Sequence, residues 1–89
     1  MTARTLRIIN EKGLHARASA KFVEVVEAHD AAAQVSKDGM TVSGDSIMGL
    51  LMLAASRGTS IDVATSGAEQ DKLADALEAL VANRFGEDY

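Results

Sequence analysis

Apolar and polar residues follow two regular spacings along the chain. Residues 4–9 and 60–65 alternate between apolar and polar side chains, which is typical of half-buried β-strands. In two further segments apolar side chains recur every three or four positions, which indicates amphipathic helices. The first of these segments predicts a helix from residue 15 or 16 to about residue 29, and the second predicts a helix that ends near residues 85–86.

The centre of the chain contains two short β-type runs and one short apolar segment. Residues 33–36 and 40–43 flank Lys37-Asp38-Gly39. Asp-Gly between such runs predicts a hairpin, because Gly accepts a positive φ without steric cost. Residues 47–54 are apolar on almost every side and predict a short helix.

The order of these elements indicates the fold class. Ser66 and Glu69 have capping-box spacing at the start of the last helix. The predicted order is β-α-β-β-α-β-α, with four short strands and three helices. Such an order implies an α+β fold of two layers, in which helices cover one face of a sheet. The two middle strands must be antiparallel, because their connection is too short for a crossover.

Length and composition exclude several classes of protein. The chain has 89 residues, which is one domain over 1–89, and residues 86–89 are expected to fray. It has no Cys, which excludes disulfides, thiolate metal sites and Cys nucleophiles. Its longest apolar run is too short to span a bilayer, and its N-terminus lacks the apolar stretch of a signal peptide. We therefore expect a soluble protein.

The charge is distributed unevenly. A net charge of −4 at pH 7 argues against a dedicated nucleic-acid-binding protein. Residues 1–21, however, carry five basic side chains and one acidic one, a local balance of +4. Random scatter in a short chain explains this as well as a positive surface for an acidic partner or a phosphate. Charge alone does not separate the two.

His15 is the first candidate for chemistry. It follows Gly13-Leu14 and stands where the first helix begins, so the free amides of Ala16, Arg17 and Ala18 would form an anion site beside it. The guanidinium of Arg17 has the fork geometry that suits phosphate oxygens. Both features disfavour an imidazolium, so we expect a neutral, nucleophilic His15. The alternative is an ordinary residue at the N-cap and a solvated Arg17.

Neither of the two His residues predicts a metal site. His29 closes the first helix, where a capping or packing role is expected because a cation complements the helix dipole. No carboxylate stands at ligand spacing from either His.

Ser46 and the apolar run behind it form a second candidate region. Ser before such a run is commonly an N-cap, and a phosphorylation site is the alternative. Ile47, Met48 and Leu51 cluster on the short helix. They are either core residues or, because one helix face stays open in a two-layer fold, an adaptable docking surface.

Two motifs together resemble a known family. Gly13-Leu14-His15-Ala16-Arg17 and Ser46-Ile47-Met48-Gly49 are similar to HPr, the histidine-containing phosphocarrier of the phosphoenolpyruvate-dependent phosphotransferase system. The resemblance covers nearly the whole chain. It implies an open-faced β-sandwich, a four-stranded antiparallel sheet covered by three helices, and a carrier protein rather than an enzyme.

The resemblance also implies roles and partners, and with it we expect a cytoplasmic protein that needs no cofactor, with a monomer as the default state. His15 would accept a phosphoryl group from enzyme I and pass it to an enzyme IIA domain, with Arg17 steadying the phosphate. Ser46 would be the target of an HPr kinase/phosphorylase. The docking patch would comprise Ala20, Ile47, Met48 and Leu51.

One departure and one alternative accompany the resemblance. Many members have Pro after the motif Arg, where this chain has Ala18; we expect the stability to differ by about 1 kcal/mol or less.

The alternative function is a regulatory binding module of the same fold, controlled through Ser46 and never phosphorylated on His. The intact His motif argues against it. An autonomous hydrolase lacks a second catalytic group.

Overall fold

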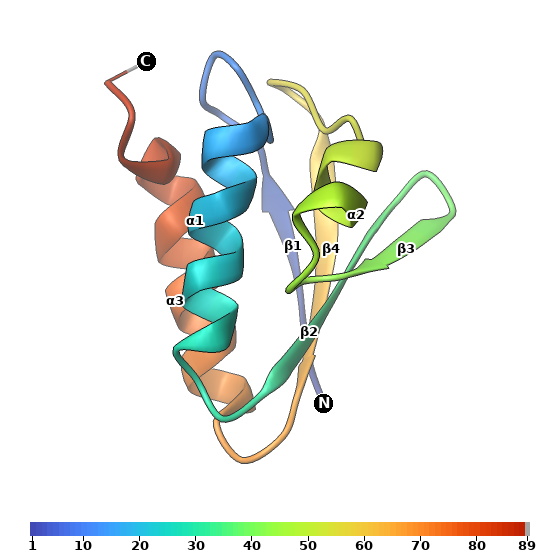
Figure 1. Ribbon diagram of the computed structural model, residues 1–89, viewed down its shortest axis with the longest axis vertical. Coiled ribbons are helices and arrows are strands. Elements are labelled where there is room, and N and C mark those ends of the chain that lie inside the picture. Colours follow the sequence, from blue (N-terminus) through green and yellow to red (C-terminus); the bar gives the residue numbers. More distant parts are fainter. Residues whose placement is uncertain (89) are drawn as a thin grey trace.

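The computed structural model describes residues 1–88, and the described chain forms a four-stranded sheet with three helices and one 3₁₀ turn. In chain order the elements are β1 (Thr2–Arg7), α1 (Ala16–Glu27), β2 (Ala32–Lys37), β3 (Met40–Ser43), α2 (Ile47–Met52), β4 (Ser60–Ser66), α3 (Gln70–Ala82) and η1 (Arg84–Gly86). The helices lie on one side of the sheet (Figure 1). The predicted element order and the two-layer α+β architecture are confirmed.

The sheet has the strand order β1-β4-β2-β3, and every neighbouring pair is antiparallel. β4 is therefore a central strand, in which Val63 pairs with Arg4 of β1 and with Val35 of β2. Burial alternates along β4, because Ile61, Val63 and Thr65 face the helices while the residues between them do not. One face of the sheet is covered and the other is open, as predicted.

The hairpin between β2 and β3 forms where the sequence predicts it. Lys37 and Met40 are paired, and the two residues between them, Asp38 and Gly39, have φ values of 51° and 83°. Two successive positive φ angles are those of a type I′ turn, whose twist matches that of the flanking strands.

The core lies between the sheet and the helices and fixes the position of α1. Phe22 of α1 is fully buried, as are Ile61 of β4 and Leu73 and Leu77 of α3. Each such side chain contributes roughly 1.5–3 kcal/mol by leaving water. The helix that carries His15 at its N-terminus is therefore anchored along its whole inner face.

Four elements have ends that differ by two or more residues from the sequence prediction. α1 ends at Glu27, so His29 lies beyond the helix and does not close it. β1 begins and ends two residues earlier, since Ile8 bonds the segment before β4, accepting from the Gly58 N–H at 2.8 Å. α2 ends at Met52, because Ala54 adopts a φ of 51°. α3 ends at Ala82, and a separate 3₁₀ turn follows it.

The predicted capping box is wrong. Ser66 is still the last residue of β4, where it pairs with Ala32, so it stands before the turn rather than at the helix start. Glu69 is the N-cap of α3 but makes no side-chain cap bond. Its carboxylate instead accepts a hydrogen bond from the Asp30 N–H at 2.7 Å, which ties the segment after α1 to the start of α3.

Candidate functional site

His15 is the N-cap residue of α1. Its backbone is extended, with φ −79° and ψ −176°, and its side chain makes no capping hydrogen bond. The side chain is 26% exposed, so the imidazole is accessible. The predicted position of His15 at the helix start is confirmed.

Gly13 and Leu14 set the approach of the chain to His15. Gly13 has a φ of 65°, and a Cβ atom added to it would lie 2.4 Å from the Ala55 carbonyl oxygen. Leu14 is buried and donates its N–H to that same carbonyl at 2.8 Å. Only glycine allows this close packing of two loops, which presses the start of α1 against the segment after α2.

The first turn of α1 has amides without intrahelical acceptors. The first helical bond runs from the Ser19 N–H to the His15 carbonyl at 2.8 Å. The amides of Ala16, Arg17 and Ala18 precede that bond, so they are the unsatisfied donors of a helix N-terminus. An anion placed there gains roughly 0.3–1 kcal/mol, and about 2 kcal/mol in a favourable geometry.

Arg17 is exposed and forms no ion pair with any part of the chain that the structure describes. Its guanidinium belongs to the same first turn of α1 as the free amides. Ala18, which stands where Pro is frequent, is fully buried and keeps its N–H. The arrangement combines an accessible imidazole, free amides and an unpaired guanidinium, which together can stabilise a phosphoryl group.

Sequence reasoning missed two residues that contact the imidazole region. The Nε2 atom of His15 is hydrogen-bonded to Oε2 of Glu87. The other carboxylate oxygen of Glu87 accepts a hydrogen bond from Nδ2 of Asn10 at 3.0 Å. Asn10 is fully buried, and its Nδ2 also donates to the Gly13 carbonyl at 2.8 Å.

The expectation that residues 86–89 fray is wrong for Glu87, whose side chain is only 5% exposed. The preceding Phe85 is buried in the core, and its carbonyl accepts a hydrogen bond from Nζ of Lys21 at 2.6 Å. Phe85 was the available signal, because an aromatic residue just after an amphipathic helix indicates that the following chain packs onto the domain. Tyr89 lies outside the described residues.

The surroundings of Glu87 keep it ionised. Burial raises the pKa of its carboxyl, but the hydrogen bonds from Asn10 and His15 and the charges of His15 and Lys12 outweigh burial, and the pKa lies below its usual value. A carboxylate therefore faces the imidazole at neutral pH.

Ser46 is the N-cap of α2. Its Oγ accepts a hydrogen bond from the Gly49 N–H at 3.1 Å. Gly49 packs closely, because a Cβ atom there would lie 2.9 Å from Cβ of Val42 and 3.2 Å from the Ser46 hydroxyl. The capping interpretation is confirmed, and Ser46 is half-buried.

The apolar run of α2 is divided between core and surface. Leu50 is fully buried, whereas Ile47, Met48 and Leu51 are 41%, 71% and 36% exposed. Met52, which the sequence analysis did not single out, is 64% exposed. α2 packs against α1, where Ala20 is half-buried. The predicted open face of the short helix exists.

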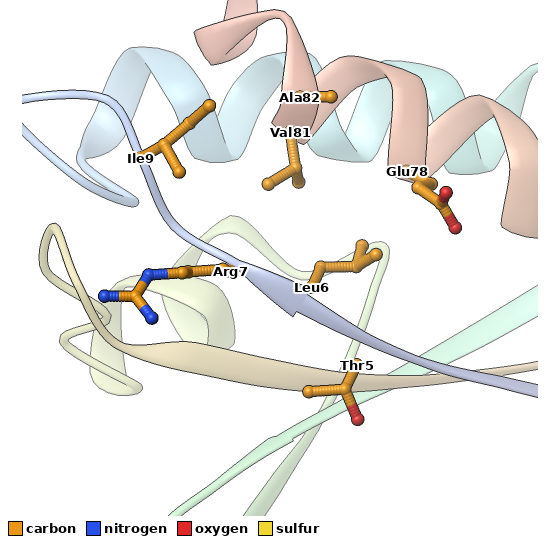
Figure 2. A pocket seen from close by; sticks show the side chains of 7 residues that line it. All are labelled: Thr5, Leu6, Arg7, Ile9, Glu78, Val81 and Ala82. Atoms are coloured by element: carbon orange, nitrogen blue, oxygen red, sulfur yellow. The ribbon is translucent and has the colours of Figure 1, made fainter.

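The hollows of the described chain lie elsewhere. One of ≈ 300 Å³ separates β1 from α3, and Figure 2 shows Leu6 and Val81 pointing toward each other across it, while the Arg7 guanidinium extends away. A second, of ≈ 340 Å³, is lined by three arginines and three neighbouring residues: Arg7, Arg57, Arg84, Ile8, Ile9 and Gly58. His15 lines neither of them.

Metal binding and membrane insertion find no support in the described residues. No group of three or more His, Asp or Glu side chains among them is arranged to hold a metal ion. None of the helices within residues 1–88 has the length and hydropathy needed to cross a bilayer.

Comparisons with known proteins agree with this geometry. The model of the family described as "PTS HPr component phosphorylation site" matches residues 2–83. The chain is 45% identical over 87 residues to the phosphocarrier protein HPr of Cupriavidus necator, and 44% identical over 87 residues to that of Neisseria meningitidis serogroup A. In both cases the match covers 98% of each chain.

The fold matches solved structures as well. The crystal structure of HPr-C-His from Thermoanaerobacter tengcongensis superposes with a TM-score of 0.95, at 34% identity over 100% of both chains. The chain therefore belongs to the HPr family, whose members are phosphocarrier proteins of the phosphotransferase system and not enzymes.

Proposed function

We propose that His15 carries the phosphoryl group, which it accepts from phosphorylated enzyme I and passes to an enzyme IIA domain in the cytoplasm, for sugar uptake or its regulation. The observation that carries the proposal is the position of His15: a partly exposed imidazole at the N-cap of α1, next to three amides without intrahelical acceptors. The negative charge of a phosphoryl group on His15 needs hydrogen-bond donors beside the imidazole, and a helix N-terminus supplies them.

Phosphoryl transfer needs few other groups of this chain besides the imidazole. A lone pair on the imidazole attacks phosphorus, and the bond from phosphorus to the donor atom breaks with its electron pair remaining on the donor. The amides of Ala16, Arg17 and Ala18 and the Arg17 guanidinium offset the charge that arrives. In this proposal the partner completes the reacting site.

The docking patch comprises Ala20, Ile47, Met48 and Leu51, and we extend it to Met52 because that side chain is also exposed. An apolar patch of this size suits a weak, transient interface, so that a monomer can serve enzyme I and enzyme IIA in succession. Methionine side chains adapt to partners of different shape.

Ser46 is the regulatory position, modified by an HPr kinase/phosphorylase where the cell has one. A phosphate on Ser46 would add about −1.5 to −2 charges at the start of α2, directly before the exposed Ile47 and Met48. The phosphorylated side chain would weaken partner docking, because it brings negative charge to the docking patch and removes apolar contact there.

The test is phosphorylation by phosphoenolpyruvate and enzyme I. The wild-type protein should form an acid-labile, base-stable adduct. His15→Ala should form none, whereas the matched control His29→Ala should form it at the wild-type rate, because His29 lies beyond the other end of α1, where its ring bonds the Val25 carbonyl at 2.8 Å. An adduct on His15→Ala would contradict the proposal.

A further inference from the structure

Three arginine side chains line one hollow at the end of β1. Arg7, Arg57 and Arg84 lie around the hollow of ≈ 340 Å³, and no Asp or Glu lines it. None of the three guanidiniums forms an ion pair with another side chain within residues 1–88. The hollow includes no residue of the docking patch and neither His, so the inference goes beyond the proposed function.

Three distant segments of the chain bring these arginines together. Arg7 is the last residue of β1, Arg57 lies in the turn before β4, and Arg84 follows α3. Ile8 joins the first two segments, because its N–H donates to the turn before β4 and its carbonyl accepts from that turn, each at 2.8 Å. The buried Phe85 joins the third segment to the core. The positions of the three arginines are therefore fixed by the fold.

Arg84 reaches the hollow through an unusual backbone. Its φ is 55°, and that of Phe85 is 54°. For residues other than glycine such a backbone costs on the order of 1–3 kcal/mol, persists only where surrounding contacts hold it, and is frequent where proteins bind ligands. Burial of the Phe85 ring and the bond from Nζ of Lys21 to the Phe85 carbonyl at 2.6 Å hold it here.

The electrostatics of this hollow favour a bound anion. The chain has 13 acidic and 9 basic side chains, so carboxylates are plentiful. Arg4, for example, bonds Asp75 at 2.7 Å and Glu78 at 3.0 Å. The three arginines of the hollow have no such partner among the described residues, and their like charges repel one another. An anion that binds between them turns this repulsion into attraction.

The chemistry of arginine indicates the kind of anion. A guanidinium is always charged and presents its N–H groups in a fork that matches two oxygens of a phosphate. A single phosphate carries about −1.5 to −2 charges at pH 7, which leaves part of three positive charges unbalanced. A diphosphate group balances them. The volume of ≈ 340 Å³ lies within the range of roughly 300–1,000 Å³ that is typical of small-molecule sites.

A second hollow, of ≈ 300 Å³, adjoins the first and is largely apolar. Arg7 and Ile9 line both hollows. Figure 2 shows Leu6 and Val81 pointing toward each other across the apolar hollow, while the Arg7 guanidinium extends away from it. The single acidic residue in its lining, Glu78, is the one already paired with an arginine of β1. A flat nucleobase, whose faces are apolar, suits such a surface better than a sugar, which is polar all round.

We propose that the two adjoining hollows form a binding site for a nucleoside diphosphate. The two phosphates lie between Arg7, Arg57 and Arg84, whose guanidiniums donate hydrogen bonds to the phosphate oxygens. The base packs against Leu6 and Ile9 in the apolar hollow. Binding is non-covalent, and no bond of the ligand breaks.

The probe is ADP without a divalent cation, titrated into ¹⁵N-labelled, unphosphorylated protein at low ionic strength. Amide NMR signals of Ile9 and Gly58 should shift and saturate, with a dissociation constant below about 1 mM. Pyrophosphate, which has no base, should bind more weakly, and adenosine, which has no phosphate, should bind most weakly. Added salt should weaken the binding of ADP, because all three arginines are exposed.

Glutamine variants of the arginines test the contacts with the phosphates. Arg57→Gln and Arg84→Gln should each raise the dissociation constant of ADP roughly 5-fold, since each removes one exposed charge pair with a phosphate. Both side chains are exposed, so the variants should fold. Lys72→Gln is the matched control, because it removes one exposed positive charge on α3 that lines neither hollow, and it should bind ADP as the wild type does.

Three results would overturn the inference. The first is the absence of saturation by ADP up to about 10 mM. The second is an equal loss of affinity in Lys72→Gln and Arg57→Gln, which would mean that the net charge alone attracts the nucleotide. The third is a set of shifts confined to the amides of residues 16–18, which would place the anion at the start of α1. Each of these readouts is independent of phosphorylation by enzyme I.

Discussion

The Leu14 N–H donates to the Ala55 carbonyl at 2.8 Å, so the loop before α1 is bonded to the segment after α2. His15 follows Leu14 directly. The position of the imidazole thus depends on a contact between two loops that are about forty residues apart in the sequence, and Gly13 is the residue that allows them to approach.

Gly13→Ala should destabilise the protein by more than the strain of a positive φ alone. That strain is roughly 1–2 kcal/mol, and at Gly13 the new Cβ atom also meets the Ala55 carbonyl oxygen at 2.4 Å. Urea denaturation measures the free energy of unfolding. Gly39→Ala is the control, because Gly39 has a φ of 83° but nothing lies within 4 Å of the place that its new Cβ atom would take. Equal losses for the two variants would show that the contact with Ala55 is unimportant.

Ser46→Ala should lower the free energy of unfolding by roughly 0.5–2 kcal/mol, because the Gly49 N–H loses its acceptor. Ser46→Asp should keep the cap and most of the stability, since Asp is a good N-cap residue. The effects of the two variants on the rate of phosphorylation by enzyme I should be the reverse of their effects on stability. Ser46→Asp should slow phosphorylation by enzyme I, while Ser46→Ala should not; equal rates for the two variants would contradict the regulatory role of the position.

Met48→Glu should weaken the interaction with enzyme I without unfolding the domain. Met48 is 71% exposed, so its replacement should change stability by no more than about 0.5 kcal/mol. We expect the KM for enzyme I to rise roughly 10-fold, which corresponds to ~1.4 kcal/mol. Met40→Glu is the matched control, because Met40 is an exposed Met on β3, outside the docking patch. A similar rise in both variants would mean that general charge, and not the patch, determines docking.

Low pH should reduce the free energy of unfolding, in part through Glu87 and Glu69. Burial raises the pKa of Glu87, but the bonds from Asn10 and His15 overcome this effect; at Glu69 the bond from the Asp30 N–H lowers the pKa. A lowered pKa means that the folded state favours the carboxylate. The stabilisation is therefore fully present above the usual value of 4.5 and is lost as pH falls through the lower, folded pKa.

The measurement is the free energy of unfolding between about pH 6 and pH 2.5 for the wild type and Glu87→Gln. The difference between them should shrink as the pH falls. A difference that stays constant over this range would show that the Glu87 charge contributes nothing to stability.

Local patterns predicted most of the fold, because each strand and helix has its own spacing of apolar residues. The Asp38-Gly39 turn and the helix start at His15 are local signals, and both were found in the structure. Ser66 and Glu69 show the limit of such signals. Their spacing fits a capping box, yet the pairing of Ser66 with Ala32 in the sheet extends β4 through the position that the cap would need.

The candidate site was predictable only where its residues are close in sequence. His15, Arg17 and the first-turn amides form one motif, and Ser46 precedes a recognisable apolar run. The contact between His15 and Glu87 spans 72 residues and depends on the buried Phe85 and on Asn10. No periodicity reports such a contact, because it arises from how the chain after α3 folds back onto the domain.

The central claim is that the imidazole of His15 carries the phosphoryl group. The most direct measurement is the ³¹P–¹⁵N coupling in ¹⁵N-histidine-labelled protein after reaction with phosphoenolpyruvate and enzyme I. We predict a single phosphorus signal coupled to a ring nitrogen of His15, with His29 unchanged. Phosphorus coupled to His29 or to no histidine nitrogen would contradict the account.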